Sequence, residues 1–145
     1  MRRWTEDDCA RIAELEREIF PDPWKEEMLL STYRAGNFYG LVEERDGKVV
    51  GYIGAAYDLW DAEILLVAVD AEYRRQRIAK DLMLAVIDRF RKLDKENVFL
   101  EVRRSNSAAQ ALYFGLGFES VAVREKYYEN TEDALVLKLA LKDEK

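Results

Sequence analysis

One stretch, residues Val98–Phe118, constrains the fold of this 145-residue chain more than any other. Its first part, Asn97–Arg103, is apolar at most positions, which is typical of a strand buried on both faces within a sheet. Either residue of the pair Ser105–Asn106 offers a side-chain oxygen that can cap a helix. We expect that helix at about Ser107–Phe114, ended by the two glycines of the segment Gly115–Gly117. The stretch therefore predicts a strand, a tight turn, a short helix and the start of another strand.

A single carboxylate, Glu101, interrupts the apolar strand. It either lies in water near the strand end, or apolar neighbours make it a stronger proton acceptor, and the pattern leaves both interpretations open. Taken alone, Tyr113 on the predicted helix is more typical of a core residue, and Asn106 of a helix cap. The stretch nevertheless places a carboxyl and a phenol close together in sequence.

The chain contains no histidine, which removes several kinds of catalysis at once. Ser-His-Asp and Cys-His pairs and the common histidine-based zinc sites are excluded. Proton transfer near neutral pH must fall to carboxylates, tyrosine, lysine, cysteine, the N-terminal amine or water. Cys9 is the only cysteine, so no disulfide can form within the chain, which suits a reducing cytoplasm. We expect no metal.

Length and charge predict a soluble globular protein with a single domain, residues 1–145. Hydrophobic residues make up 49% of the chain and charged residues 36%. The net charge of −6 argues against a general partner among nucleic acids or anionic membranes. No apolar run approaches the length needed to span a membrane. We therefore expect a cytoplasmic location.

The first third of the chain predicts a short strand followed by two helices. Thr5 is the expected cap of the first helix, and Pro21 ends it. The apolar face of that helix recurs largely at helical spacing and consists of Cys9, Ile12, Ala13, Leu15, Glu16, Ile19 and Phe20. The second helix, Lys25–Arg34, is expected to bury Met28, Leu29 and Thr32. Trp24, in the turn between the helices, is by default a core residue.

The remaining segments predict five strands and, after the strand at Ala62–Val69, a loop that leads into a further helix. Phe38–Glu44 and Lys48–Tyr57 flank Asp46-Gly47, a strong signal for a two-residue hairpin turn. Ala62–Val69 is apolar almost throughout and is expected beside the strand at Val98–Arg103. Two further strands are expected at Glu119–Arg124 and Asp133–Leu141.

A basic loop follows the strand at Ala62–Val69 and leads into a helix. Loop amides at a helix N-terminus form a natural phosphate site, and four cationic side chains raise the local potential, namely Arg74, Arg75, Arg77 and Lys80. The alternative interpretation is a solvated basic surface turn, and composition alone favours it.

Several motifs resemble the GCN5-related N-acetyltransferases, and among them the RimI-type bacterial enzymes that acetylate the N-terminal alanine of a small-subunit ribosomal protein. The matching residues are Leu100-Glu101-Val102-Arg103, Ser105-Asn106, Ala109, Leu112-Tyr113, Leu116-Gly117-Phe118 and, further on, Arg124, Tyr127, Tyr128, Glu132, Asp133 and Ala134. The resemblance covers nearly the whole chain. It implies an α/β acetyltransferase fold in three α/β/α layers, with four helices around a mixed, mostly antiparallel sheet of about seven strands.

The resemblance also implies roles for particular residues. Glu101 would be the general base and Tyr113 the general acid toward the departing thiolate. The residues implied to contact acetyl-CoA are Val67, Ala68, Val69, Arg75, Gln76, Arg77, Ile78, Ala79, Lys80 and Asn106. Those implied to border the acceptor are Trp24, Tyr127 and Tyr128. The acceptor would be a protein N-terminus, from a small-subunit ribosomal protein in this family type.

Besides Ala71, which replaces a proline often found after the strand and is a smaller change, two positions depart from the family pattern. Arg77 stands where the pyrophosphate loop has its first glycine, and Leu66 stands where this family type often has a polar residue. Glycine suits a backbone that passes close to phosphate or adopts positive φ, so Arg77 either obstructs the phosphates or pairs with them. The sequence therefore leaves two alternatives to the leading function: an acetyltransferase for a small amine or lysine, and a catalytically impaired or redesigned domain that keeps the fold.

Overall fold

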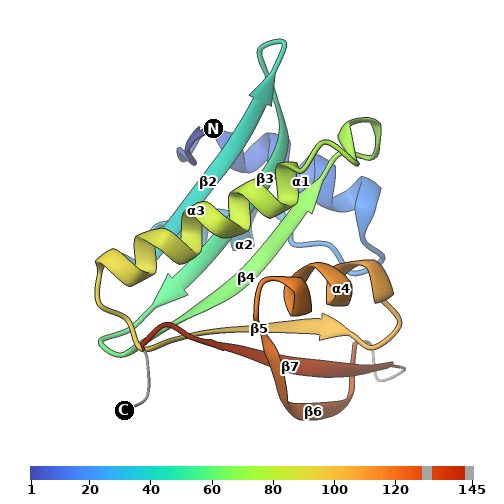
Figure 1. Cartoon of the computed structure of the whole chain (residues 1–145). Coiled ribbons are helices and arrows are strands. Elements are labelled where there is room, and N and C mark those ends of the chain that lie inside the picture. Colours follow the sequence, from blue (N-terminus) through green and yellow to red (C-terminus); the bar gives the residue numbers. More distant parts are fainter. Residues whose placement is uncertain (129–131, 143–145) are drawn as a thin grey trace.

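The computed structural model describes residues 1–128 and 132–142, without the side chains of residues 126–128. Within these residues a seven-stranded sheet lies between two pairs of helices (Figure 1). The elements are β1 (Arg2–Arg3), α1 (Asp8–Ile19), α2 (Glu26–Tyr33), β2 (Phe38–Arg45), β3 (Lys48–Tyr57), β4 (Asp61–Val69), a 3₁₀ turn (Ala71–Tyr73), α3 (Ile78–Lys92), β5 (Asn97–Arg103), α4 (Ser107–Gly115), β6 (Glu119–Tyr128) and β7 (Glu132–Ala140).

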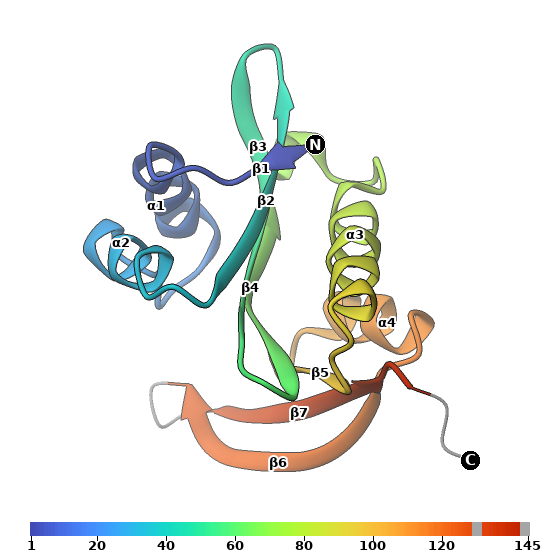
Figure 2. The same ribbon diagram turned by 90° about the vertical axis from the view of Figure 1, so that its left-hand side faces the viewer.

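The strands lie in the order β1-β2-β3-β4-β5-β7-β6. Only the neighbours β4 and β5 are parallel among the described pairs, and the others are antiparallel. Helices α1 and α2 cover one face of the sheet, and α3 and α4 lie on the other (Figure 2). The predicted three-layer fold, with its mixed sheet and four helices, is confirmed.

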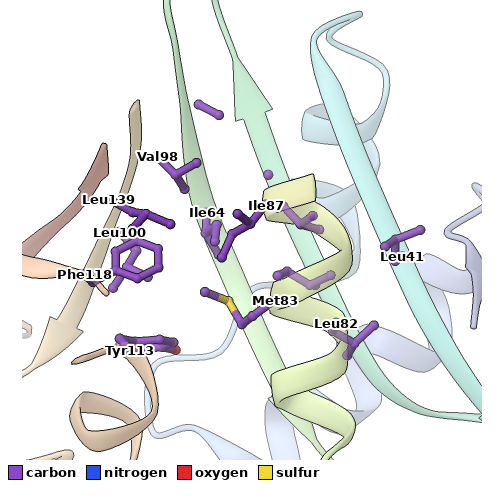
Figure 3. Close-up of a cluster of buried hydrophobic side chains, with 14 of the residues drawn as sticks. Leu41, Ile64, Leu82, Met83, Ile87, Val98, Leu100, Tyr113, Phe118 and Leu139 are labelled. Carbon is purple, nitrogen blue, oxygen red and sulfur yellow. The ribbon is translucent and has the colours of Figure 1, made fainter. Parts of the chain in front are cut away.

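Two clusters of buried side chains hold the layers together. Under α3, Met83 and Ile87 pack toward residues of β4, β5 and α4, whereas Leu82 lies on the side of β3 (Figure 3). Under α1 and α2, the indole of Trp4 meets the ring of Phe38 edge-on, with 5.0 Å between centroids. Burial of apolar area at about 25 cal/mol per Å² makes these clusters the main source of stability.

The β2–β3 hairpin turns as its sequence predicts. Asp46 and Gly47 have φ of 53° and 78°, which is the left-handed conformation that a two-residue turn of this kind needs at both central positions. An Asp tolerates that conformation better than most residues, and Gly adopts it without strain.

Two details near the first helices differ from expectation. Helix α1 begins at Asp8, and the Thr5 hydroxyl donates a hydrogen bond to the Asp8 carboxylate at 3.1 Å instead of capping the helix. Arg2 holds the same carboxylate with both terminal nitrogens, at 2.8 and 2.9 Å. Met28 is 46% exposed, so of the residues expected to be buried on α2 only Leu29 is fully inside. Helix α2 is only eight residues long and presents a narrow buried face.

Strands β4 and β5 pair at one end and separate at the other, and this separation positions the site. Their paired residues run only from Asp61 opposite Asn97 to Ile64 opposite Leu100. At the same point the register of β4 against β3 shifts by one residue, which leaves Leu65 as an extra residue in β4. Such a bulge bends the strand and increases its twist. Beyond it the two strands diverge, with α4 beside the opening (Figure 1).

No helix in the described ranges is long and apolar enough to cross a membrane.

Candidate active site

Two adjoining cavities lie where β4 and β5 separate. The larger, here called the basic groove, has a volume of about 930 Å³, and Arg74, Arg75, Arg77 and Lys80 are among its lining residues. The smaller, here called the acidic chamber, has a volume of about 210 Å³. Its lining includes Glu16, Asp22, Glu101 and Arg103. The two cavities share a wall made of Phe20, Val67, Arg103, Asn106, Ala109 and Tyr113.

Most residues that the family resemblance implies for the cofactor lie along the basic groove. The lining includes Val67, Ala68, Val69, Arg75, Arg77, Ile78, Ala79, Lys80 and Asn106. Gln76 is the exception. It does not line the groove, and its side-chain oxygen accepts a hydrogen bond from Arg45 Nη1 at 2.9 Å, which ties the loop to the β2–β3 hairpin.

The loop before α3 has the backbone of an anion site. Arg75 and Arg77 both adopt left-handed conformations, with φ of 67° and 65°. Alternating left-handed residues direct successive N–H groups toward one side and form a concave nest for anions. The loop leads directly into Ile78, the first residue of the 15-residue helix α3, whose positive dipole end adds to the attraction. The basic groove can therefore hold a phosphate group against backbone amides.

Arg77 occupies the position where a glycine was expected on conformational grounds. Its left-handed φ is the one that favours glycine, and for an L-residue with a Cβ this conformation costs roughly 1–2 kcal/mol. Its side chain is 66% exposed, and the guanidinium lies 4.0 Å from the Asp81 carboxylate, which makes only a loose surface pair. The side chain is therefore held weakly at the edge of the groove.

Glu101 lies in the acidic chamber with an ionic partner. Its Oε1 accepts a hydrogen bond from Arg124 Nη1 at 2.5 Å, and its side chain is 21% exposed. The expectation that β5 is buried on both faces is wrong for one of them. Val98, Leu100 and Val102 are buried, whereas Phe99, Glu101 and Arg103 alternate with them on the half-exposed face. Glu101 thus lies on a half-exposed face of β5 and lines the chamber.

Tyr113 and Asn106 lie between the two cavities. Tyr113 is only 7% exposed, and its ring packs edge-on against Phe118 with 6.1 Å between centroids (Figure 3). Asn106 caps α4, because its side-chain oxygen accepts a hydrogen bond from the Ala109 amide at 3.1 Å. Both residues line the basic groove and the acidic chamber.

The residues implied for the acceptor are only partly described. Trp24 lines the acidic chamber together with Leu66, the second position that departs from the family pattern. Tyr127 and Tyr128 end strand β6, but their side chains lie outside the described residues.

A buried carboxylate that the sequence pattern did not single out forms part of the chamber wall. Glu16 on α1 is 2% exposed, and its two oxygens accept hydrogen bonds from the Tyr52 hydroxyl at 2.5 Å and the Trp24 amide at 3.0 Å. Burial raises the pKa of Glu16, although these two hydrogen bonds act in the opposite direction. Its place within the apolar face of the predicted helix was the available signal.

Within the described ranges no group of three or more Cys, Asp or Glu residues could hold a metal ion. The described side chains of the site offer proton transfer by carboxylates and a phenol beside an anion-binding loop.

Fold and site together define an α/β protein with a split sheet, in which a basic loop lines one of two adjoining cavities and carboxyl groups line the other. Residues 9–118 match the family model described as the acetyltransferase (GNAT) family. The chain belongs to that family.

Comparison with individual proteins shows which members of the family this chain is similar to. The ribosomal protein bS18-alanine N-acetyltransferase of Escherichia coli strain K12 is 32% identical over 137 residues, which are 92% of this chain and 92% of that protein. The crystal structure of the ribosomal-protein-S18-alanine N-acetyltransferase from Escherichia coli aligns with a TM-score of 0.91 at 28% identity, over 99% of this chain and 94% of that chain. A NatC complex bound to Gag peptide and CoA contains a chain with a TM-score of 0.84 at 26% identity, covering 98% and 100%. The similarity to the ribosomal-protein type is confirmed.

Proposed function

We propose that this chain transfers the acetyl group of acetyl-CoA to the N-terminal amine of a protein, with an N-terminal alanine as the preferred acceptor. The observation that carries the proposal is the opening between β4 and β5, which has a phosphate-type loop along one cavity and a carboxylate and a phenol at the other. The similarity to bS18-alanine N-acetyltransferases supports the choice of acceptor.

The basic groove suits the cofactor in both charge and shape. Four cationic side chains and the nest before α3 would hold the pyrophosphate. Main-chain groups of Val67, Ala68 and Val69 border the groove where β4 is no longer paired with β5, so they are placed for hydrogen bonds to the pantetheine arm. The thioester would then lie near the wall that the groove shares with the acidic chamber.

The acidic chamber suits an amine that must lose a proton. Among its described lining residues, Glu16, Asp22 and Glu101 carry carboxyl groups, whose oxygens can accept hydrogen bonds from an ammonium group. Glu101, whose Oε1 is hydrogen-bonded to Arg124, accepts the ammonium proton. The amine then forms a C–N bond with the thioester carbonyl carbon, and the amide of Val69 steadies the oxyanion. As the intermediate collapses, the C–S bond breaks, Tyr113 donates a proton to the departing sulfur, and the nitrogen releases its second proton to water. The Tyr113 phenolate regains a proton from water.

The direct experiment is an acetyl-transfer assay that measures thiol release. We expect turnover with peptides that begin with Ala, lower turnover with Ser or Thr, and little with polyamines or internal lysines. Higher turnover with polyamines would reassign the acceptor to small amines. Absence of turnover with every acceptor, together with measurable acetyl-CoA binding, would instead favour the impaired domain that Arg77 and Leu66 suggest.

We also propose that residues 1–145 act as one domain, in the cytoplasm, where newly made ribosomal proteins are available as acceptors.

A further inference from the structure

The loop between α1 and α2 forms one wall of the acidic chamber and is anchored at two points. Phe20, Asp22 and Trp24 line the chamber. The Asp22 carboxylate pairs with Arg103 of β5, on the far side of the opening between the strands. The Trp24 amide donates its hydrogen bond to Glu16 on α1. The loop thus bridges from the helical layer to β5.

Glu16 is an unusual residue for the inner anchor. An ionised carboxylate with 2% exposure is unfavourable unless its oxygens are hydrogen-bonded. One donor is the Tyr52 hydroxyl, which is itself fully buried on β3. The other is the Trp24 amide in the loop between α1 and α2. Asp22 also acts on Glu16, and its negative charge disfavours ionisation. A serine or an apolar residue at this position on α1 would lose less hydration free energy on burial than a carboxylate does.

We propose that Glu16 is a positioning residue for the acceptor: held from behind by Tyr52, it fixes the Trp24 amide and with it the chamber wall that receives the N-terminal residue of the substrate. Two prolines, Pro21 and Pro23, restrict the loop but supply no N–H groups, so few backbone donors are available to hold it in place. Glu16 uses one of them. The proposal rests on the proposed acetyl transfer and adds a residue that sets acceptor affinity.

The test compares Glu16→Leu with Glu16→Gln. Leucine keeps the approximate volume and removes the acceptor for the Trp24 amide, whereas glutamine keeps a side-chain oxygen for it. We expect the KM for an Ala-initiated peptide to rise about tenfold in the leucine variant, with the KM for acetyl-CoA unchanged within about twofold. The glutamine variant restores the peptide KM to within about threefold of wild type. Glu14→Leu, an exposed position on the same helix, is the matched control and changes neither KM.

A second readout does not depend on activity. Amide hydrogen exchange measured by NMR is expected to show a protected Trp24 amide in the wild type and the glutamine variant, and fast exchange in the leucine variant. Because this readout needs no turnover, it separates failure of the positioning role from failure of the proposed function.

A folded leucine variant with an unchanged peptide KM and a protected Trp24 amide would overturn the proposal. If that variant does not fold, Tyr52→Phe decides, because it removes the hydroxyl that holds Glu16 on the side away from the loop. Its peptide KM is then expected to rise about threefold, with faster exchange of the Trp24 amide and an unchanged KM for acetyl-CoA. An unchanged peptide KM together with an equally protected Trp24 amide would contradict the proposal.

Discussion

At the residue scale, the two proposed proton-transfer groups occupy unlike surroundings. Glu101 lies on the half-exposed face of β5 beside a guanidinium, and Tyr113 is almost fully buried between the two cavities. A general base must lie within hydrogen-bond reach of the proton that it takes, and a general acid within reach of the leaving group. Glu101 lines the acidic chamber, and Tyr113 lines the wall between the two cavities, which agrees with the roles proposed for the two side chains.

Replacing either group is expected to slow the chemical step. Glu101→Gln and Tyr113→Phe each should lower kcat by about 10²-fold or more, the usual contribution of a positioned acid or base. The affinity for acetyl-CoA should change by less than about threefold, because neither side chain holds the phosphates. Stopped-flow thiol release measures the first quantity and calorimetry the second. A kcat within about threefold of wild type in the glutamine variant would remove Glu101 from the mechanism.

Arg77 brings a positive charge to the basic groove and holds a strained left-handed backbone, and separate variants can resolve these two effects. Arg77→Gln removes the charge and keeps the strained left-handed backbone, whereas Arg77→Gly removes both. We expect the glycine variant to be more stable than the glutamine variant by about 1 kcal/mol in urea unfolding, because only glycine adopts this φ without strain. We expect glutamine to weaken acetyl-CoA binding about threefold at low salt and less at high salt. Tighter binding by the glutamine variant would mean that the arginine side chain obstructs the groove.

The buried carboxylate Glu16 gives the stability a distinct pH dependence. Because burial raises its folded-state pKa above the ordinary 4.5, the folded state holds this proton more tightly than the unfolded chain. The resulting stabilisation is full below pH 4.5 and is lost as pH rises through the folded-state value. Relative to Glu16→Gln, the wild type should therefore lose stability over the pH range that begins at about 4.5 and ends above the folded-state pKa. Urea unfolding of both proteins across that range measures the difference, and a constant difference would contradict the raised pKa.

At the element scale, the start of α3 is set by its contact with β3. A Cβ built on Gly51 would lie 2.8 Å from Ile78 Cγ2, closer than real contacts allow, so this glycine lets the first turn of α3 approach the sheet. The same turn carries the end of the proposed phosphate loop. The position of the helix and the geometry of the basic groove are thus linked through one small residue.

Gly51→Ala should accordingly damage stability and cofactor binding together. We expect a loss of about 1–3 kcal/mol, typical of overpacking, and weaker binding of acetyl-CoA as Ile78 is displaced. Gly115→Ala on α4 is the matched control, because a Cβ added there would meet no described atom within 4 Å and its φ is not left-handed. Urea unfolding and calorimetry on both variants check the expectation. Equal behaviour of the two variants would show that α3 adapts freely.

The elements themselves were largely predictable, and their exact contacts were not. The Asp46-Gly47 turn and the apolar periodicity of β4 and α3 are local signals, so the sequence places them correctly. Met28 was expected to be buried together with its neighbour Leu29. The short helix α2 presents a narrower buried face than this pair would need, and Met28 is exposed. Local patterns carry no information on how broadly a helix contacts its sheet.

At the scale of the whole molecule, the site depends on contacts between distant segments. Arg124 beside Glu101, Arg103 beside Asp22 and Tyr52 beside Glu16 join residues 23 to 81 positions apart. Spacing within one element cannot reveal such pairs. The family resemblance located the groove residues and the loop but gave no hint of the buried Glu16, because its role arises only when α1, β3 and the loop meet.

The proposed cofactor binding, acid–base roles and acceptor access all depend on the split between β4 and β5. The bulge at Leu65 lies where the parallel pairing stops. Beyond it, the main chains of β4 and β5 no longer pair with one another, so the sheet is open there. A sheet paired along its full length would have no room for an extended ligand in its plane.

Isothermal titration of acetyl-CoA into the wild-type chain tests this central claim most directly. The expected result is saturable 1:1 binding with a dissociation constant in the micromolar range or below, weakened by added salt because phosphate contacts are screened. No heat up to high micromolar acetyl-CoA, under conditions where the protein is folded, would show that the open strands do not hold the cofactor.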